Sequence, residues 1–255
     1  MGALHQHIAF ITGGGSGIGQ AIANGFAREG ARVVVADVNE AGARETVRQV
    51  EAAGGRADAF VLDVADRAAC QAVARQVSER IGKVSVLVNN AGVVRRNVMS
   101  QSPELVPDDW DDIVSVNLTG MFNVTHAFLE PLREMRGRVI NIGSIQSLAH
   151  VTGQLSPAYT TTKHGVVGFT RALAADLGKV GVRVNAIGPG FSATPLNASM
   201  RAANPDRVKY FVDHTPLGRV GSAEDMVGPA IFLASDQSAY VTGVLLMVDG
   251  GYHTV

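Results

Sequence analysis

The chain is poor in cysteine and has almost no excess charge. Cys70 is the only cysteine among 255 residues, so neither an intrachain disulfide nor a cysteine-rich metal site can form. Lysine and arginine number 22 and aspartate and glutamate 23, which leaves a net charge of -1. A balance so close to zero provides no broad field that would attract nucleic acid or acidic lipid. We therefore expect small molecules as partners and no nucleic acid.

Long apolar runs are also missing. The longest extends over Tyr240–Val248 and falls far short of the roughly 18 residues that cross a bilayer. Residues Met1–Gln6 carry neither the basic start nor the apolar centre of a secretory signal. Four histidines have no metal-ligand spacing with acids or cysteines, namely His150, His164, His214 and His253. We expect a cytoplasmic protein without membrane contact and without a metal.

Short β-branched runs alternate with longer segments of helical period. The seven candidate strands are His7–Thr12, Arg32–Ala36, Ala57–Leu62, Val84–Asn89, Arg138–Gly143, Val182–Ile187 and Val244–Val248. Segments rich in Ala, Leu, Arg and Glu lie between them, among them Ala41–Ala53, Arg67–Ile81 and Ala158–Leu177. Nearly continuous apolar strands in this order predict a parallel sheet covered on both faces. We expect one α/β domain over residues 1–255, a Rossmann-like, doubly wound, seven-stranded parallel sheet.

The first strand runs directly into a glycine-rich turn, Thr12–Gly19, and a helix follows from Gln20. Glycine allows a tight turn and a close approach of the backbone to a pyrophosphate, whose charge meets the helix N-terminus. Asp37 ends the second strand, where a carboxylate can accept both adenosine ribose hydroxyls. A 2′-phosphate would meet like charge there, and Ser16 offers no cation, so we expect NAD in preference to NADP. A flexible turn with a turn or N-cap acid remains the alternative.

Tyr159 and Lys163 stand four positions apart on a predicted helix, so their side chains project from one face. This pair alone is an ordinary helix face. Three further features precede it: Asn-Asn-Ala-Gly at 89–92, Asn117 in a long helix, and Ser144 just past the fifth strand. With the glycine turn, these motifs resemble the short-chain dehydrogenase/reductase family. The resemblance covers almost the entire chain.

The resemblance implies an NAD(P)-dependent oxidoreductase that acts on the CH–OH group of donors. It implies a catalytic set of Asn117, Ser144, Tyr159 and Lys163. It also implies dinucleotide contacts at Gly13, Ser16, Gly17, Ile18, Gly19, Asp37, Asp63, Val64, Asn89, Ala91, Gly92, Tyr159, Lys163, Pro189, Gly190 and Thr194. Similar proteins are often tetramers, so the resemblance implies a homotetramer as well.

The chemistry of such a set follows from its side chains. A hydride leaves an alcohol carbon readily only if the hydroxyl proton leaves too, so a base must lie within hydrogen-bond reach. We expect Lys163 and an oxidised nicotinamide to lower the pKa of Tyr159 from its ordinary value of about 10. Ser144 would bind the substrate oxygen. Asn117 either holds a water that passes protons from Lys163 to solvent, or is a buried amide at a helix distortion.

The sequence departs from the family pattern between Ser144 and Tyr159. Fourteen residues lie between them, where the family usually has about twelve, and the longer loop contains polar side chains such as Gln146. We expect this loop to reach over the substrate. The alternation of strands and helices also breaks at about 191–221, which we interpret as an insertion on the substrate side.

The substrate class rests on similarity to one branch of the family, the gluconate 5-dehydrogenases and 2-deoxy-gluconate 3-dehydrogenases. The similar segments are 95–97, 144–147 and 194–197. A guanidinium suits a carboxylate and an amide suits hydroxyls, so we expect a sugar acid or polyol bound by Ser144, Gln146, Tyr159 and Arg96. Alternatively, the arginines lie on the surface or at a subunit contact.

Two other functions remain open. A 3-oxoacyl-(acyl-carrier-protein) reductase would share the fold, but such enzymes usually prefer NADPH, against which Asp37 argues. A non-catalytic dinucleotide-sensing module would be expected to lose the base. Because Ser144, Tyr159 and Lys163 are all present, we favour an enzyme.

Overall fold

Seven parallel strands form one sheet in the computed structural model, which describes residues 2–100, 102–151 and 156–255. The strand order is β3-β2-β1-β4-β5-β6-β9. The strands are β1 (Ile8–Thr12), β2 (Arg32–Asp37), β3 (Arg56–Val61), β4 (Val86–Asn89), β5 (Arg138–Ile142), β6 (Arg183–Pro189) and β9 (Leu245–Val248). Every neighbouring pair in the sheet is parallel. The predicted doubly wound fold is confirmed, and all seven predicted strands are present with shifts of a few residues at their ends.

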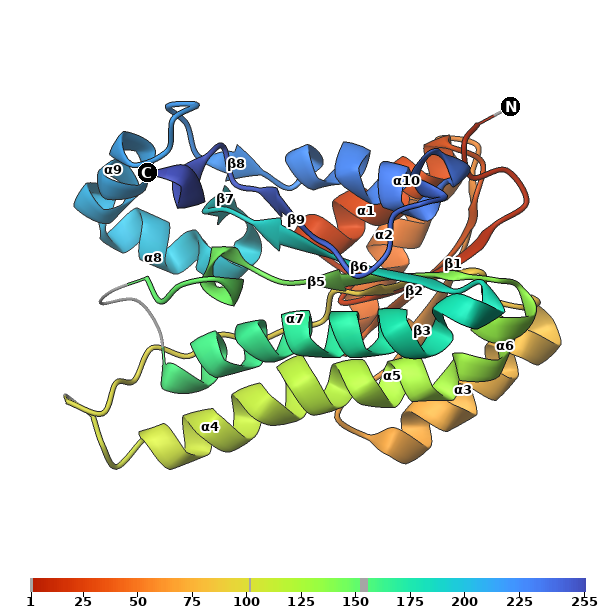
Figure 1. The fold of residues 1–255 in the computed structure, drawn as a ribbon, viewed down its shortest axis with the longest axis horizontal. Coiled ribbons are helices and arrows are strands. Elements are labelled where there is room, and N and C mark those ends of the chain that lie inside the picture. Colours follow the sequence, from red (N-terminus) through yellow and green to blue (C-terminus); the bar gives the residue numbers. More distant parts are fainter. Residues whose placement is uncertain (1, 101, 152–155) are drawn as a thin grey trace.

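Helices cover both faces of this sheet, and Figure 1 shows them as two layers with the strands between. One layer contains α1 (Gly17–Arg28), α2 (Glu40–Ala52) and α10 (Val227–Ala234). The other contains α3 (Arg67–Arg80), α4 (Val106–Val114), α5 (Met121–Ala127), α6 (Leu129–Glu134) and α7 (Pro157–Leu177). Successive residues of a strand point to opposite faces. Val33 and Val35 accordingly join the core beneath the first layer and Val34 the core beneath the second, which explains the continuous apolar runs.

The helix around Asn117 is not regular. A π-helical segment, Ser115–Gly120, joins α4 to α5. Such segments often occur at functional sites. In the part of the chain that the structure describes, no helix combines the length and the apolar character that a membrane span requires.

The break in alternation at about 191–221 corresponds to a separate group of short elements. These are β7 (Ser192–Ala193), the 3-10 helix Pro195–Asn197, α8 (Ala198–Ala203), α9 (Pro205–Asp213) and β8 (Gly221–Ser222). β7 pairs with β8 in a small sheet of its own. The group follows the carboxyl end of β6, and Figure 1 places α8 and α9 beyond the end of the sheet near which α7 begins.

Candidate active site

The glycine turn folds tightly at the N-terminus of α1. Gly13 and Gly17 have φ values of 61° and 55°, a region that side chains with a Cβ rarely adopt. A Cβ on Gly19 would lie 2.2 Å from the carbonyl oxygen of Gly13, so only glycine fits there. The turn is therefore a backbone cradle of the kind that a pyrophosphate needs, next to the free NH groups of a helix N-terminus.

Side chains at the carboxyl ends of two other strands fix this turn. The side chain of Asn90 donates to the carbonyl oxygens of Thr12 and Gly13 over 3.0 and 2.9 Å. Asp37 accepts from the backbone NH groups of Gly15 and Asn39, both at 2.9 Å. Asp37 therefore acts as a turn acid and also lines the cavity beside the turn. Sequence reasoning missed Asn90, although its place within Asn-Asn-Ala-Gly was a usable signal.

Two adjoining cavities receive most of the predicted site residues. The first, called here the loop cavity, is lined by predicted dinucleotide contacts Gly13, Ser16, Gly17, Ile18, Asp37, Asp63, Val64, Ala91, Gly92 and Thr194. The second, called here the tyrosine cavity, is lined by Tyr159, Lys163, Ser144, Gln146, Arg96, Pro189 and Gly190. Ile18, Gly92 and Thr194 line both cavities, so one extended molecule can reach from the glycine turn to Tyr159.

Two predicted dinucleotide contacts lie outside these cavities. Gly19 packs against Gly13 and Asn90. Asn89 is buried, and its amide donates to Thr125 and Asn141 over 2.9 and 2.8 Å. Both residues therefore stabilise the surroundings of the site without lining either cavity.

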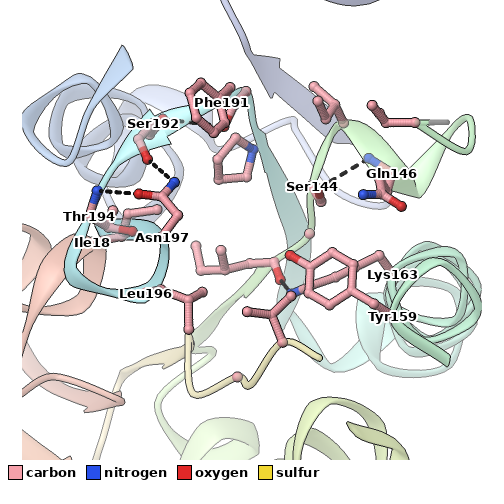
Figure 2. Close-up of a pocket in the computed structure, with 18 of the residues that line it drawn as sticks. Ile18, Ser144, Gln146, Tyr159, Lys163, Phe191, Ser192, Thr194, Leu196 and Asn197 are labelled. Carbon is pink, nitrogen blue, oxygen red and sulfur yellow. Dashed lines mark hydrogen bonds between the residues drawn. The ribbon is translucent and has the colours of Figure 1, made fainter. Parts of the chain in front are cut away.

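Ser144, Tyr159 and Lys163 meet at the carboxyl end of β5, as Figure 2 shows. Ser144 caps a short 3-10 helix, Ile145–Ser147 (η2), and its hydroxyl accepts from the Gln146 backbone NH at 3.1 Å. The Ser144 hydroxyl lies close enough to the Tyr159 phenol to lower its pKa. Lys163 donates to the carbonyl oxygen of Ile142 over 2.8 Å, and its Nζ lies 5.6 Å from the centre of the Tyr159 ring. The arrangement places two hydroxyls and one ammonium at a single point of the tyrosine cavity.

Burial acts on the two ionisable groups of this site. Burial raises the pKa of Tyr159 above its ordinary value. The Ser144 hydroxyl and the Arg96 guanidinium lower this pKa, but they offset the effect of burial only in part. Arg96 is thus a cation that lowers the pKa of the phenol, and the ammonium of Lys163 lies against the same ring. Burial also lowers the pKa of Lys163 to about 8, because a buried ammonium loses its hydration.

Asn117 lies in the π-helical segment with 3% exposure. Its side-chain oxygen accepts from the backbone NH of Val93 at 2.8 Å, and its amide donates to the carbonyl oxygen of Val93 at 3.0 Å. The side chain therefore clamps the segment after β4. A cavity of about 10 Å³ between Asn117, Asn89 and Lys163 is close to the volume that one water requires. Asn89 Oδ1, which is buried, has no hydrogen-bond partner among the described residues.

Only one of the two neighbouring arginines reaches the tyrosine cavity. Arg96 is one of its lining residues, whereas Arg95 forms an ion pair with Asp112 on the surface. The far wall comes from the segment after β6, where Phe191 and Phe211 stack with ring centres 4.1 Å apart. Sequence reasoning placed this segment on the substrate side and singled out residues 194–197, but it did not identify Phe191 and Phe211 as its wall.

Comparison with known proteins gives close matches over the full length. A family model described as enoyl-(acyl carrier protein) reductase matches residues 13–253. A 3-oxoacyl-(acyl-carrier-protein) reductase of Thermotoga maritima is 36% identical over 97% of this chain and 98% of its own. A 2-dehydro-3-deoxy-D-gluconate 5-dehydrogenase of Dickeya dadantii is 37% identical over 98% of this chain and 96% of its own.

Among solved structures, a similar one is a gluconate 5-dehydrogenase from Burkholderia cenocepacia in complex with NADP and tartrate. It is 36% identical, has a TM-score of 0.92, and the alignment covers 99% of this chain and 97% of that chain. That complex contains NADP, whereas Asp37 led us to expect a preference for NAD in this chain. The comparisons thus support a nicotinamide dinucleotide but not the choice between its two forms.

Proposed function

The chain belongs to the short-chain dehydrogenase/reductase family and is a nucleotide-dependent oxidoreductase, and from this premise we propose that it oxidises a secondary alcohol of a sugar acid or polyol, in the manner of a gluconate 5-dehydrogenase. The observation that carries the proposal is the position of Arg96, which lines the same cavity as Ser144 and Tyr159. A guanidinium there can bind a carboxylate while the two hydroxyls engage the reacting carbon. The tartrate in the Burkholderia structure, a hydroxylated acid, supports this substrate class.

The proposed roles follow from the geometry. Tyr159 takes the hydroxyl proton of the substrate as general base, and Ser144, which lines the same cavity, holds the substrate oxygen. An oxidised dinucleotide, when bound, would supply a hydride acceptor and, before transfer, a positive charge beside the phenol. That charge favours the phenolate and acts against the burial that raises the pKa of Tyr159. Tyr159 and Lys163 would also contact the dinucleotide at its nicotinamide end.

Lys163 is proposed to return the proton to solvent. Its ammonium borders the small cavity that also touches Asn117 and Asn89. A water in that cavity would connect Lys163 to the unpartnered Asn89 Oδ1 and to the π-helical backbone. The side chain of Asn117 already forms two hydrogen bonds with the backbone of Val93. We therefore propose that Asn117 positions the segment after β4, which borders both larger cavities.

NAD as the preferred form stays a proposal that rests on charge. Asp37 lines the loop cavity, where its carboxylate would repel a 2′-phosphate. The backbone NH groups of Gly15 and Asn39 each donate one hydrogen bond to this carboxylate. The carboxylate can accept further hydrogen bonds from ribose hydroxyls. The cytoplasmic location and the homotetramer are likewise proposals, and light scattering of the purified protein tests the latter.

The experiment that tests the main proposal is a substrate screen. Sugar acids and polyols are offered with NAD and with NADP, 3-oxo thioesters are offered with NADH and with NADPH, and the absorbance of the reduced nicotinamide is followed. Turnover of sugar acids or polyols is the expected result. Preferential reduction of 3-oxo thioesters would favour the alternative function, an acyl-carrier-protein reductase, which the Thermotoga relative supports.

Tyr159→Phe should abolish turnover while dinucleotide binding persists. Full turnover by that variant would contradict the mechanism.

A further inference from the structure

Gln146 belongs to the wall of the tyrosine cavity, and its amide is held by a chain of hydrogen bonds that the proposed function does not use. The residue lies in η2 and is 3% exposed. The hydroxyl of Thr160, the residue after Tyr159 on α7, lies 2.5 Å from Gln146 Oε1. His150 Nδ1 lies 3.0 Å from the same hydroxyl.

The direction of the hydrogen bonds in this chain is fixed by the atoms themselves. An amide oxygen carries no hydrogen, so the hydrogen between Thr160 and Gln146 Oε1 comes from the Thr160 hydroxyl. That hydrogen is then not available to His150, and His150 Nδ1 must donate to Thr160. Nδ1 carries a hydrogen in one neutral tautomer and in the cation, so the chain persists in both charge states of His150.

The consequence is a fixed orientation of the Gln146 amide. With Oε1 occupied by Thr160, Nε2 is the group left for the cavity, and it makes no hydrogen bond to any described residue. Figure 2 shows the amide nitrogen of Gln146 turned toward Ser144 and the oxygen turned away from it. The cavity therefore presents a hydrogen-bond donor, and not an acceptor, close to the place where the substrate oxygen is proposed to bind.

We propose that Thr160, supported by His150, is a positioning residue that fixes Gln146 as a donor and thereby selects substrates with an acceptor oxygen beside the reacting carbon. The inference rests on the proposed function, since hydroxyl and carboxylate oxygens are the acceptors a sugar acid offers. A buried donor left unpaired is costly, so a site of this kind discriminates against an analogue without that oxygen.

The kinetic test compares Thr160→Val, which removes the hydroxyl and keeps the shape, with Thr160→Ser, which restores it. For the best sugar acid or polyol, Thr160→Val should raise KM about tenfold with kcat nearly unchanged, and Thr160→Ser should recover the KM of the unaltered protein. For an analogue lacking the adjacent hydroxyl, Thr160→Val should leave KM unchanged. Thr161→Val, one position further on the same helix and exposed, is the matched control and should behave as the unaltered protein.

In a Gln146→Leu background, Thr160→Val should have no further effect, because the two residues act through one contact. An equal loss with every substrate would show a merely structural role and overturn the proposal. An unchanged KM in Thr160→Val would overturn it as well.

A second measurement separates this inference from the proposed substrate class, because it needs no substrate. The ¹⁵N chemical shifts of His150 in the dinucleotide complex report which ring nitrogen carries the hydrogen. A protonated Nδ1 in the neutral ring is the expected result. An unprotonated Nδ1 would overturn the inference even if sugar acids are turned over, whereas a protonated Nδ1 with no turnover of sugar acids or polyols would reject only the proposed substrate class.

Discussion

The ammonium of Lys163 lies 2.8 Å from the carbonyl oxygen of Ile142, the last residue of β5. This hydrogen bond holds a buried cation where the sheet ends and the tyrosine cavity begins. The hydrogen bond does not offset the loss of hydration, because the pKa of Lys163 falls from 10.5 to about 8. The folded protein therefore binds the proton of Lys163 less tightly than the unfolded chain does.

Stability should accordingly rise with pH above neutrality. Between about 8 and 10.5 the unfolded chain keeps the proton of Lys163 while the folded protein has lost it, so the free energy of unfolding increases with pH. From pH ~7 to ~9 this group alone should add roughly 1 kcal/mol. Urea unfolding at both pH values measures the change. Lys163→Met should abolish the increase, and Lys179→Met, which alters an exposed lysine, should retain it. An increase that persists in Lys163→Met would refute the assignment.

Arg96 should set the pH dependence of alcohol oxidation. Its positive charge lowers the pKa of Tyr159 against the effect of burial, and oxidation requires the phenolate. The kcat/KM for oxidation should therefore rise with pH, and Arg96→Gln should move this rise to higher pH. Arg96→Lys should keep more of the original profile. Arg95→Gln, which alters the surface ion pair with Asp112, serves as the control, and an unmoved profile in Arg96→Gln would exclude the coupling.

Asn117 should support dinucleotide binding through Val93. Asn117→Asp keeps an acceptor for the Val93 NH but replaces the donor with an oxygen that faces the Val93 carbonyl. The buried mismatch should lower stability by about 1–3 kcal/mol and weaken dinucleotide binding. Thermal unfolding and titration of dinucleotide fluorescence measure the two effects. If both stayed at the values of the unaltered protein, the clamp would have no energetic importance.

Asp37 should decide between the two dinucleotides. In Asp37→Ala, the repulsion of a 2′-phosphate is removed, and the ratio of kcat/KM for NAD over NADP should fall about tenfold, which corresponds to a loss of roughly 1.4 kcal/mol of discrimination. Asp37→Asn keeps an oxygen that can accept from the Gly15 NH but removes the negative charge. It therefore tests the effect of the charge separately from the effect of the hydrogen bond. Equal kinetics with NAD and NADP in the unaltered protein would refute the preference.

The sequence predicted the fold well because its signals are local. Continuous apolar runs such as Val33–Ala36 and the spacing of Tyr159 and Lys163 are read within a few residues, and the structure contains both as expected. The missed features depend on contacts between distant segments. Nothing near Asn117 identifies Val93 as its partner, and nothing near Gln146 identifies the Thr160 hydroxyl. The raised pKa of Tyr159 likewise depends on how completely distant segments bury the phenol.

The wall that Phe191 and Phe211 form belongs to a group of short elements separate from the seven-stranded sheet. The glycine turn, Ser144 and α7 are supported by the main sheet and its helices, and residues 191–221 attach to it after β6. Substitutions at Phe191 and Phe211 should therefore change which substrates fit the tyrosine cavity, whereas substitutions at Thr194, which lines both cavities, should also affect the dinucleotide.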